Sequence, residues 1–308
     1  MSVADTVSDE YRKSIGDAAS AIETFAAASK ILRDCYRGRP NVLRACAALT
    51  ELEHQSDYKG APGDQPIDNL ASMIDLLIQA GNDNLRAVSV IIKVEPVFVW
   101  AHLPTGRAAL EAFAYSRWLA ECPLDRDTRV KRGLLMRLDD AKQLARFDIP
   151  ALTEQSQRAK DSIRGFSAAN GWAMSIGQMG IGGEVLIDTK LALDHLFGDP
   201  EGVRSVAPKL WSYLSGASHG NPYALIQSID QSGGVSDGSM VTAALVVRAR
   251  DVHNLVATII LGGIRAWEMA GRYFGWEIEN WRSELIPVQQ YLARTARVLA
   301  ADAAAASA

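Results

Sequence analysis

The sequence predicts an all-α protein, a single-core bundle of roughly nine to eleven helices. Apolar residues recur at three- and four-residue steps along most of the chain, and glycine- and proline-rich breaks separate these segments. A hydrophobic share of 48% is enough for a substantial core, and a charged share of 22% is ordinary for a globular protein. No internal repeat or shift in composition marks a boundary, so we expect one helical domain over residues 1–300 and a frayed, alanine-rich tail over 301–308.

The first half of the chain has the pattern of successive helices separated by short breaks. The expected helices cover residues 10–33, 41–53, 67–80, 104–121, 125–147 and 152–166. Residues 81–83 ("GND") are a candidate interruption, and the β-branched segment 87–100 would suit a strand. We assign 87–100 to a helix because no second strand pattern lies nearby to pair with it. Pro104 suits the first turn of its helix, which ends before Pro123.

The second half contains two segments that we expect to be flexible loops. Residues 170–184 carry five glycines, and residues 230–239 are rich in glycine and serine. Between them, helices are expected over 184–197 and 202–218, with a kink or restart at Pro208. The segment 240–274 is either one long helix or a short segment followed by a helix, and 279–300 closes the fold.

Charge and cysteine content restrict the cellular setting and the partners. The net charge of −4 argues against a general nucleic-acid binder, although a local basic face remains compatible with it. No secretory signal is visible, and the longest apolar run is shorter than the ~18–20 residues that span a bilayer. Cys35, Cys46 and Cys122 include no close pair, which favours reduced thiols. We therefore expect a cytoplasmic protein without a membrane partner. The basic run at 126–137 is interleaved with acids and predicts a solvated helix face.

The stretch "YLSGASHGNPYAL" (213–225) places His219 between small residues. If 206–218 is helical, Gly220 ends the helix and His219 lies in its last turn. Two interpretations stay open. A protonated imidazole at a helix end gains about 0.3–1 kcal/mol from the helix dipole. Alternatively, His219 is a catalytic proton donor or acceptor, with Asn221 and Tyr223 as ligand-binding neighbours.

Arg107, Glu111 and Tyr115 follow one another at four-residue steps in "GRAALEAFAYSRWLAE". They could form a simple ion pair along one helix. Their neighbours are nearly all apolar, however, and charged groups inside a core are costly and often mark a site. We assign Glu111 to catalysis and Arg107 and Tyr115 to ligand binding. We also expect the three residues to meet His219 and Asn221 in the interior.

Other candidate motifs are weaker. Arg248 lies five residues before His253, a spacing that chance alone produces often in this chain, and both are candidate catalytic residues. Asp139 and Asp140 would suit magnesium and a diphosphate, but Gln143 stands where a third acid is needed. The segment 170–183 lacks the lysine of a phosphate-binding loop, and it could instead be a lid. We see no serine-hydrolase elbow, Cys–His pair or zinc site. No metal site or cofactor is therefore expected, apart from Mg²⁺ if the protein is an enzyme that acts on a diphosphate.

The two stretches "GRAALEAFAYSRWLAE" and "YLSGASHGNPYAL" together resemble a group of uncharacterised, mostly actinobacterial helical proteins, which are similar in style to the HEPN superfamily (higher eukaryotes and prokaryotes nucleotide-binding). HEPN ribonucleases carry an arginine four to six residues before a histidine, and they dimerise around one RNA cleft. The resemblance thus implies RNA as partner and a homodimer. In this sequence only Arg248 and His253 have that spacing. Before His219, the positions where the arginine is expected hold Ser212, Tyr213 and Leu214.

The sequence is compatible with three functions. The first is a HEPN-like intracellular effector of defence or toxin type that binds or cleaves RNA, in which Arg248 holds a phosphate and His253 or His219 moves a proton. The second is an enzyme for a small molecule, with a helical pocket lined by some of the seven tryptophans and eight tyrosines, and with isoprenoid or diphosphate chemistry. The third is a helical interaction protein without catalysis.

Overall fold

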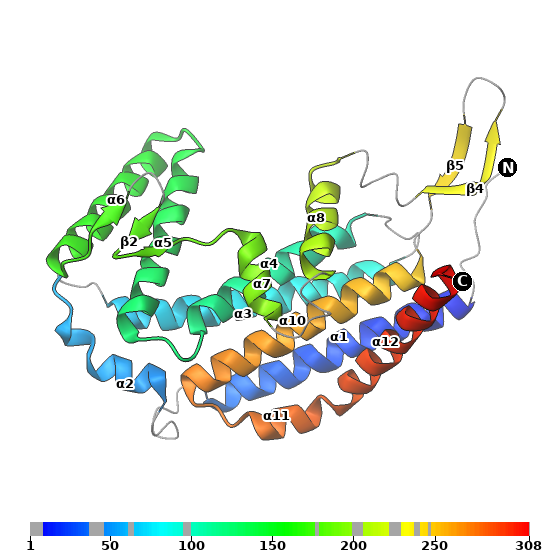
Figure 1. The fold of residues 1–308 in the computed structure, drawn as a ribbon, viewed down its shortest axis with the longest axis horizontal. Coiled ribbons are helices and arrows are strands. Elements are labelled where there is room, and N and C mark those ends of the chain that lie inside the picture. Colours follow the sequence, from blue (N-terminus) through cyan, green and yellow to red (C-terminus); the bar gives the residue numbers. More distant parts are fainter. Residues whose placement is uncertain are drawn as a thin grey trace.

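A computed structural model describes residues 9–36, 46–60, 65–94, 100–175, 179–198, 206–221, 229–236, 241–245 and 248–307. This part of the chain contains eleven α-helices, which confirms the predicted all-α fold (Figure 1). In the first half the helices are α1 (Asp9–Tyr36), α2 (Ala47–Glu53), α3 (Pro66–Lys93), α4 (His102–Ala120), α5 (Arg126–Ala145) and α6 (Pro150–Ala169). In the second half they are α7 (Thr189–Phe197), α8 (Val206–Ser218), α10 (Ala249–Phe274), α11 (Ile278–Glu284) and α12 (Ile286–Ser307).

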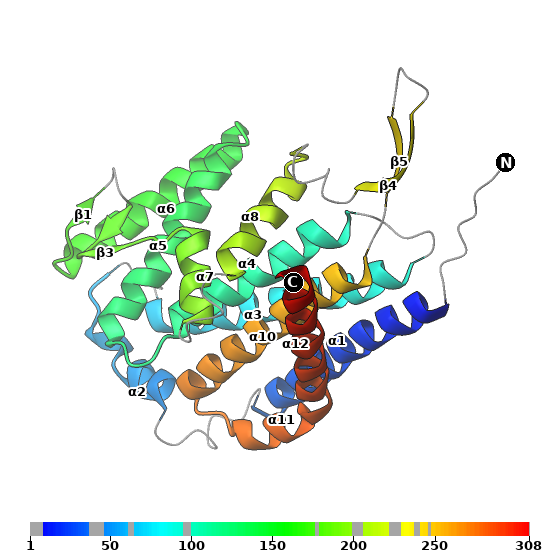
Figure 2. The same ribbon diagram turned by 45° about the vertical axis from the view of Figure 1, so that its right-hand side comes forward.

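Four long helices, α1, α3, α4 and α10, lie side by side and form the centre of the molecule (Figures 1 and 2). Helices α11 and α12 pack along α1, and α12 also contacts α10. Helices α7 and α8 pack on α4, while α5 and α6 pair at one end of the bundle. Most buried apolar side chains belong to one cluster inside this bundle, and a smaller cluster lies between α5, α6 and the short strands beside them. In the described part of the chain, no helix is both long and apolar enough to cross a membrane.

Two glycines and two phenylalanines fix the spacing of the central helices. Phe25 of α1 and Phe113 of α4 meet edge to face, with ring centroids 6.4 Å apart, and both are fully buried. A Cβ atom at Gly81 of α3 would lie 2.5 Å from the Phe113 ring, and one at Gly263 of α10 would lie 2.7 Å from the Phe25 ring. The backbones of α3 and α10 therefore approach the rings so closely that no side chain fits between them. Helix α4 is held between neighbours on several sides.

Two expectations about helix boundaries are resolved by these elements. Helix α3 continues through residues 81–83, so the "GND" sequence does not interrupt it, and residues 87–93 are helical as predicted. Residues 95–99 lie outside the described residues. Within 240–274, α10 begins only at Ala249 and follows a strand, so the second of the two alternatives is correct. Gly275, in the left-handed conformation with φ +69°, ends α10.

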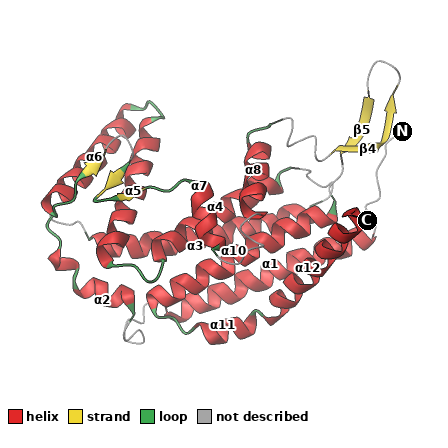
Figure 3. Cartoon of the chain, viewed as in Figure 1, coloured by secondary structure: helices red, strands yellow, loops and turns green. Residues whose placement is uncertain are grey.

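Both segments expected to be loops contain strands, so these two expectations were wrong (Figure 3). The first holds a small antiparallel sheet of β1 (Met174–Ser175), β2 (Gly180–Ile181) and β3 (Glu184–Val185). The second contributes to the hairpin of β4 (Ile229–Ser236) and β5 (Val241–Leu245). The three strands of the first segment have two residues each, which is too short to show the alternation of apolar and polar residues by which a strand is recognised in a sequence. Glycine-rich composition therefore concealed them.

The expectation of a solvated basic face on α5 was wrong for Arg129 and Arg132, which are only 2% and 8% exposed. Arg129 forms an ion pair with Glu51 of α2, and its guanidinium lies 5.2 Å from the centre of the Tyr273 ring. Arg132 donates to Glu121 at 2.7 Å and to the carbonyl oxygen of Trp118 at 2.8 Å. Partners from distant segments thus compensate the burial of both cations.

Candidate functional site

Helices α4 and α8 bring three of the predicted site residues into one polar cluster. On α4, Arg107 Nε donates to Glu111 Oε1 at 2.7 Å. On α8, Trp211 Nε1 donates to the same carboxylate oxygen at 3.0 Å. His219 lies 112 residues from Arg107 in the sequence, and its Nε2 is 3.4 Å from Arg107 Nη1. Arg107, Glu111, Trp211 and His219 are called the Arg107 cluster below.

The end of α8 places His219 in this cluster. Gly220 adopts a φ of +66°, and its N–H donates to the carbonyl oxygen of Ala217 at 3.1 Å. The N–H of Asn221 donates to the carbonyl oxygen of Gly216 at 2.8 Å. These bonds form the turn with which glycine commonly ends a helix, as the sequence predicted. His219 is therefore held directly after α8, in the turn that ends the helix, with its side chain exposed at the surface.

The Arg107 cluster lies at the rim of the molecule and not in an apolar interior, which corrects one expectation. The side chains of Arg107 and Glu111 are 21% and 27% exposed. The Arg107 guanidinium lies 5.4 Å from the centre of the Trp211 ring. Glu111 therefore holds Arg107 through Nε and Trp211 covers one face of the guanidinium. One terminal nitrogen, Nη1, lies toward His219. Such a fixed cation beside a histidine is suited to binding an anion and transferring a proton.

Tyr115, on the same helix as Arg107, forms its hydrogen bonds with residues outside this cluster. Tyr115 is two turns from Arg107, about 12 Å along α4. Its hydroxyl oxygen is 3.3 Å from Thr189 Oγ1 and 3.4 Å from the carbonyl oxygen of Ile187, so Tyr115 positions the start of α7. Burial raises the pKa of Tyr115. Asn221 is exposed directly after the helix end, and Tyr223 lies outside the described residues.

His253 has neighbours other than those expected from sequence spacing. Its Nε2 is 2.7 Å from Ser14 Oγ of α1, and its Nδ1 is 2.9 Å from the hydroxyl oxygen of Tyr291 on α12. Arg248 is exposed at the residue before α10 and does not line the cavity beside His253, whose wall carries Arg250 and Arg294 instead. Arg248 and His253 are thus close in the sequence but do not line the same cavity.

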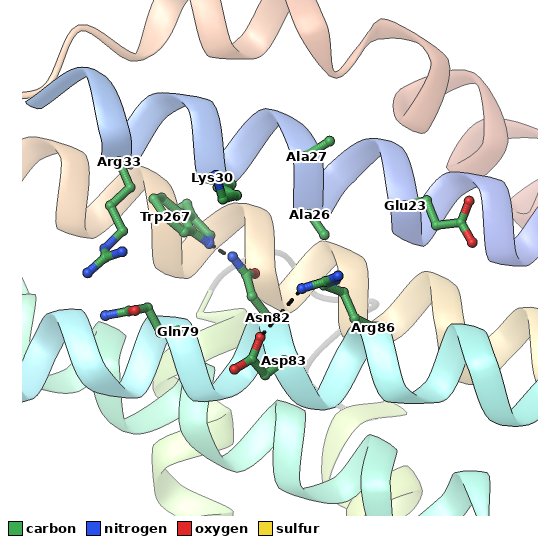
Figure 4. A pocket seen from close by; sticks show the side chains of 10 residues that line it. All are labelled: Glu23, Ala26, Ala27, Lys30, Arg33, Gln79, Asn82, Asp83, Arg86 and Trp267. Carbon is green, nitrogen blue, oxygen red and sulfur yellow. Dashed lines mark hydrogen bonds and ion pairs between the residues drawn. The ribbon is translucent and has the colours of Figure 1, made fainter. Parts of the chain in front are cut away.

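A groove of about 460 Å³ runs between α1 and α3, with Trp267 of α10 beneath it (Figure 4). Its polar groups are occupied by one another or by neighbours. Arg33 binds both carboxylate oxygens of Asp75 at 2.8 and 3.0 Å, and Trp267 Nε1 donates to Asn82 at 3.3 Å. Among the residues that the structure describes, Trp267 is the single aromatic one that lines this groove. These contacts give the groove no chemistry that matches an aromatic-lined substrate pocket.

The aspartate pair on α5 is not part of a metal site in the described residues. Asp139 accepts from Gln143 at 3.4 Å, and burial together with the neighbouring Asp139 raises the pKa of Asp140. Over the described ranges, no group of three or more histidine, cysteine, aspartate and glutamate side chains is arranged to hold a metal ion.

Sequence reasoning missed Trp211 and Ser14. The spacing in the sequence could have indicated Trp211. Trp211, Ser215 and His219 follow one another at four-residue steps, which places them on the same side of a helix. No pattern indicated Ser14, because 239 residues separate it from His253 and no motif surrounds it. Comparison of the chain with protein families, with curated proteins and with solved structures finds no match.

Proposed function

We propose that the protein is a cytoplasmic effector that binds RNA at the Arg107 cluster, and that His219 transfers a proton in cleavage of the RNA backbone. The observation that carries the proposal is the 3.4 Å approach of Arg107 Nη1 to His219 Nε2. It pairs an arginine and a histidine in space, as the HEPN resemblance implies, although the two residues come from different helices. A homodimer, which the same resemblance implies, is part of the proposal.

Arg107 supplies the phosphate contact. Its guanidinium presents planar N–H donors that match phosphate oxygens, and charge-assisted bonds of this kind are stronger than neutral ones. Glu111 and Trp211 fix the side chain before any ligand arrives, which lowers the entropic cost of binding. Because the bond from Nη1 to His219 is long, a phosphate oxygen competes with it easily.

His219 supplies the proton transfer. Once Nη1 turns to the phosphate, Nε2 of a neutral imidazole is free to accept the proton of a ribose 2′-hydroxyl. The 2′-oxygen then forms a bond to phosphorus, the bond from phosphorus to the 5′-oxygen breaks, and the leaving oxygen takes a proton from water. The products are a 2′,3′-cyclic phosphate and a free 5′-hydroxyl. Arg107 stabilises the negative charge that develops on the non-bridging oxygens of the phosphate.

The test measures binding of a fluorescent single-stranded RNA by anisotropy and its cleavage by denaturing electrophoresis. Loss of a charge-assisted hydrogen bond costs about 1.5–3 kcal/mol. We therefore expect Arg107→Ala to weaken RNA binding by roughly ten- to a hundredfold. His219→Ala should bind RNA within about threefold of the parent and lose cleavage. Equal RNA affinity in Arg107→Ala and the parent, or undiminished cleavage in His219→Ala, contradicts the proposal.

Arg126 of α5 offers a matched control. Its side chain is 28% exposed, its Nη1 is 2.9 Å from Asp57, and its guanidinium lies 5.0 Å from the centre of the Tyr58 ring. Unlike Arg107, Arg126 also lies 3.4 Å from a second carboxylate, that of Asp127. Arg126→Ala removes the same charge from a similar environment, so it should leave RNA affinity unchanged. A comparable loss in both variants would mean that RNA responds to total charge and not to the Arg107 cluster.

A further inference from the structure

A second group of reactive side chains lies where α1, α10 and α12 meet, at the end of the bundle where α1 begins and α12 ends (Figure 1). Ser14 Oγ and His253 Nε2 are 2.7 Å apart, and His253 Nδ1 lies 2.9 Å from the hydroxyl oxygen of Tyr291. All three side chains line one cavity of about 310 Å³. The described contacts thus form a chain from a hydroxyl to an imidazole to a second hydroxyl. The Arg107 cluster has no residue in it.

The third member of this chain offers an acceptor for a proton on His253 Nδ1. The Tyr291 hydroxyl oxygen is 2.9 Å from Nδ1 and 3.5 Å from the carbonyl oxygen of His253, and when the hydroxyl donates to that carbonyl oxygen its own oxygen accepts the Nδ1 proton. An imidazole protonated on Nδ1 has an unprotonated Nε2, which accepts the hydrogen bond from Ser14. This is the arrangement of a serine nucleophile, its base and a group that orients the base. Burial lowers the pKa of His253 below its ordinary value of 6.5, which favours the neutral imidazole that this role requires.

The side chains that line the cavity indicate which class of small molecule it would bind. Arg294 faces it from α12, and no hydrogen bond or ion pair joins Arg294 to another side chain within the described residues. Arg250 lines the same cavity and lies 3.6 Å from Asp251. Ala249, Val298 and Leu299 supply apolar wall. Asp17 of α1 also lines the cavity, and its negative charge raises the pKa of His253 while Arg294 lowers it. The cavity therefore combines two arginines, one carboxylate and a short apolar side, at a volume near the lower limit for small-molecule sites.

We infer that Ser14 and His253 form a hydrolytic site for small carboxylic esters that carry an anionic group. Arg294 binds the anion, and Val298 and Leu299 contact the apolar part of the substrate. The site goes beyond RNA binding at the Arg107 cluster and does not depend on it.

The reaction uses water as its co-reactant. His253 Nε2 accepts the Ser14 proton while Oγ forms a bond to the ester carbonyl carbon. The bond from that carbon to the alcohol oxygen then breaks, and the imidazolium returns its proton to the departing alcohol. Water attacks the acyl-serine with His253 again as the base, and the bond to Oγ breaks to release the carboxylic acid. One ester and one water yield one acid and one alcohol.

The first experiment treats the purified full-length parent with a fluorophosphonate probe, followed by mass spectrometry of the digested protein. The probe reacts with serines activated by a base, so Ser14 should be modified and the exposed Ser20 of the same helix should not. His253→Gln should lose the modification. Labelling elsewhere, or none at Ser14 in the parent, overturns the inference without requiring any variant to fold.

The second experiment compares hydrolysis of p-nitrophenyl butyrate with that of the p-nitrophenyl half-ester of succinic acid. We expect the anionic ester to be preferred at least tenfold in kcat/KM, and Arg294→Ala to raise KM for that ester alone. Ser14→Ala should abolish both activities, whereas Ser20→Ala should abolish neither. Equal turnover of the two esters, or hydrolysis that survives Ser14→Ala, overturns the assignment.

A pH profile separates a base from a residue that only supports the fold. Because the pKa of His253 is lowered, the unprotonated base persists as pH falls through the ordinary histidine value of 6.5, and the rate should fall only in more acidic solution. A rate that is flat down to acid denaturation removes His253 from the reaction. RNA binding measured on the same Ser14→Ala protein should equal that of the parent, so failure here is distinguishable from failure at the Arg107 cluster.

Discussion

Three arginines have the same kinds of partner but differ in exposure and in the role that we assign to them. One is Arg107 on α4, and the other two are Arg129 and Arg132 on α5. All three pair with a glutamate, and each guanidinium lies over an aromatic ring. The side chains of Arg129 and Arg132 are only 3% and 10% exposed, whereas that of Arg107 is 21% exposed and has an exposed histidine beside it. An arginine enclosed on all sides holds segments together, and one with an open edge is available to a ligand.

The enclosed pair connects several elements to α5. Arg129 reaches Glu51 of α2, which also accepts from the hydroxyl of Tyr273 on α10 at 3.2 Å. Arg132 reaches Glu121 after α4 and Glu184 of β3. Burial raises the pKa of Glu51 against the opposing attraction of Arg129. These contacts are therefore expected to influence stability, while changes at Arg107 are expected to influence binding.

The largest effect is expected from Arg129→Met. Removing this cation leaves the Glu51 carboxylate buried without its partner, and such changes cost about 3–5 kcal/mol in free energy of unfolding. Urea denaturation followed by circular dichroism measures the loss. The double variant Arg129→Met/Glu51→Leu should recover most of it, because an apolar pair of similar volume replaces a buried ion pair at little cost. A single variant within about 1 kcal/mol of the parent would show that Arg129 is not structural.

A smaller loss of stability is expected from Arg132→Lys. Arg132 donates from Nη1 to Glu121 and the Trp118 carbonyl oxygen, and from Nε to Glu184 at 3.3 Å. One ammonium group keeps the charge but cannot reproduce this planar fork, so a loss of about 1–2 kcal/mol is expected. The same urea titration measures it. Stability equal to that of the parent would mean that charge alone is required at this position.

The smallest effect is expected from Glu111→Gln at the Arg107 cluster. The amide oxygen can still accept from Trp211, but Arg107 loses its ion pair and with it part of its fixed orientation. Ordering one side chain costs about 0.5–1.5 kcal/mol, so RNA affinity should fall roughly two- to tenfold. The free energy of unfolding should change by less than about 1 kcal/mol, as is usual for partly exposed pairs. An increase in RNA affinity would indicate that Glu111 repels phosphate and does not position Arg107.

The sequence predicted the helices and part of the site, for identifiable reasons. Helical periodicity and glycine stops are local signals, so α4 and the end of α8 at Gly220 could be located from them. The face shared by Arg107 and Glu111 followed from their four-residue spacing. The approach of His219 to Arg107 was an expectation about tertiary packing, and local patterns could not give its depth. The structure places the pair at the rim.

What could not be predicted depends on partners far away in the sequence. The burial of Arg129 requires Glu51 and Tyr273, which lie 78 residues before it and 144 residues after it. The Ser14–His253 contact joins the first helix to α10. The three-stranded sheet depends on backbone pairing that leaves almost no trace in side-chain pattern. In each case the deciding information is which segments meet.

The close packing of α4 bears on which helix moves when a ligand binds at the Arg107 cluster. Phe113 of α4 packs closely against the backbone of α3 at Gly81, whereas among residues 209–218 of α8 only Leu214 is buried. We therefore expect any displacement produced by a ligand at Arg107 to occur in α8 and not in α4. A spectroscopic label on the exposed Lys209 of α8 would report it, while one on α4 would stay silent.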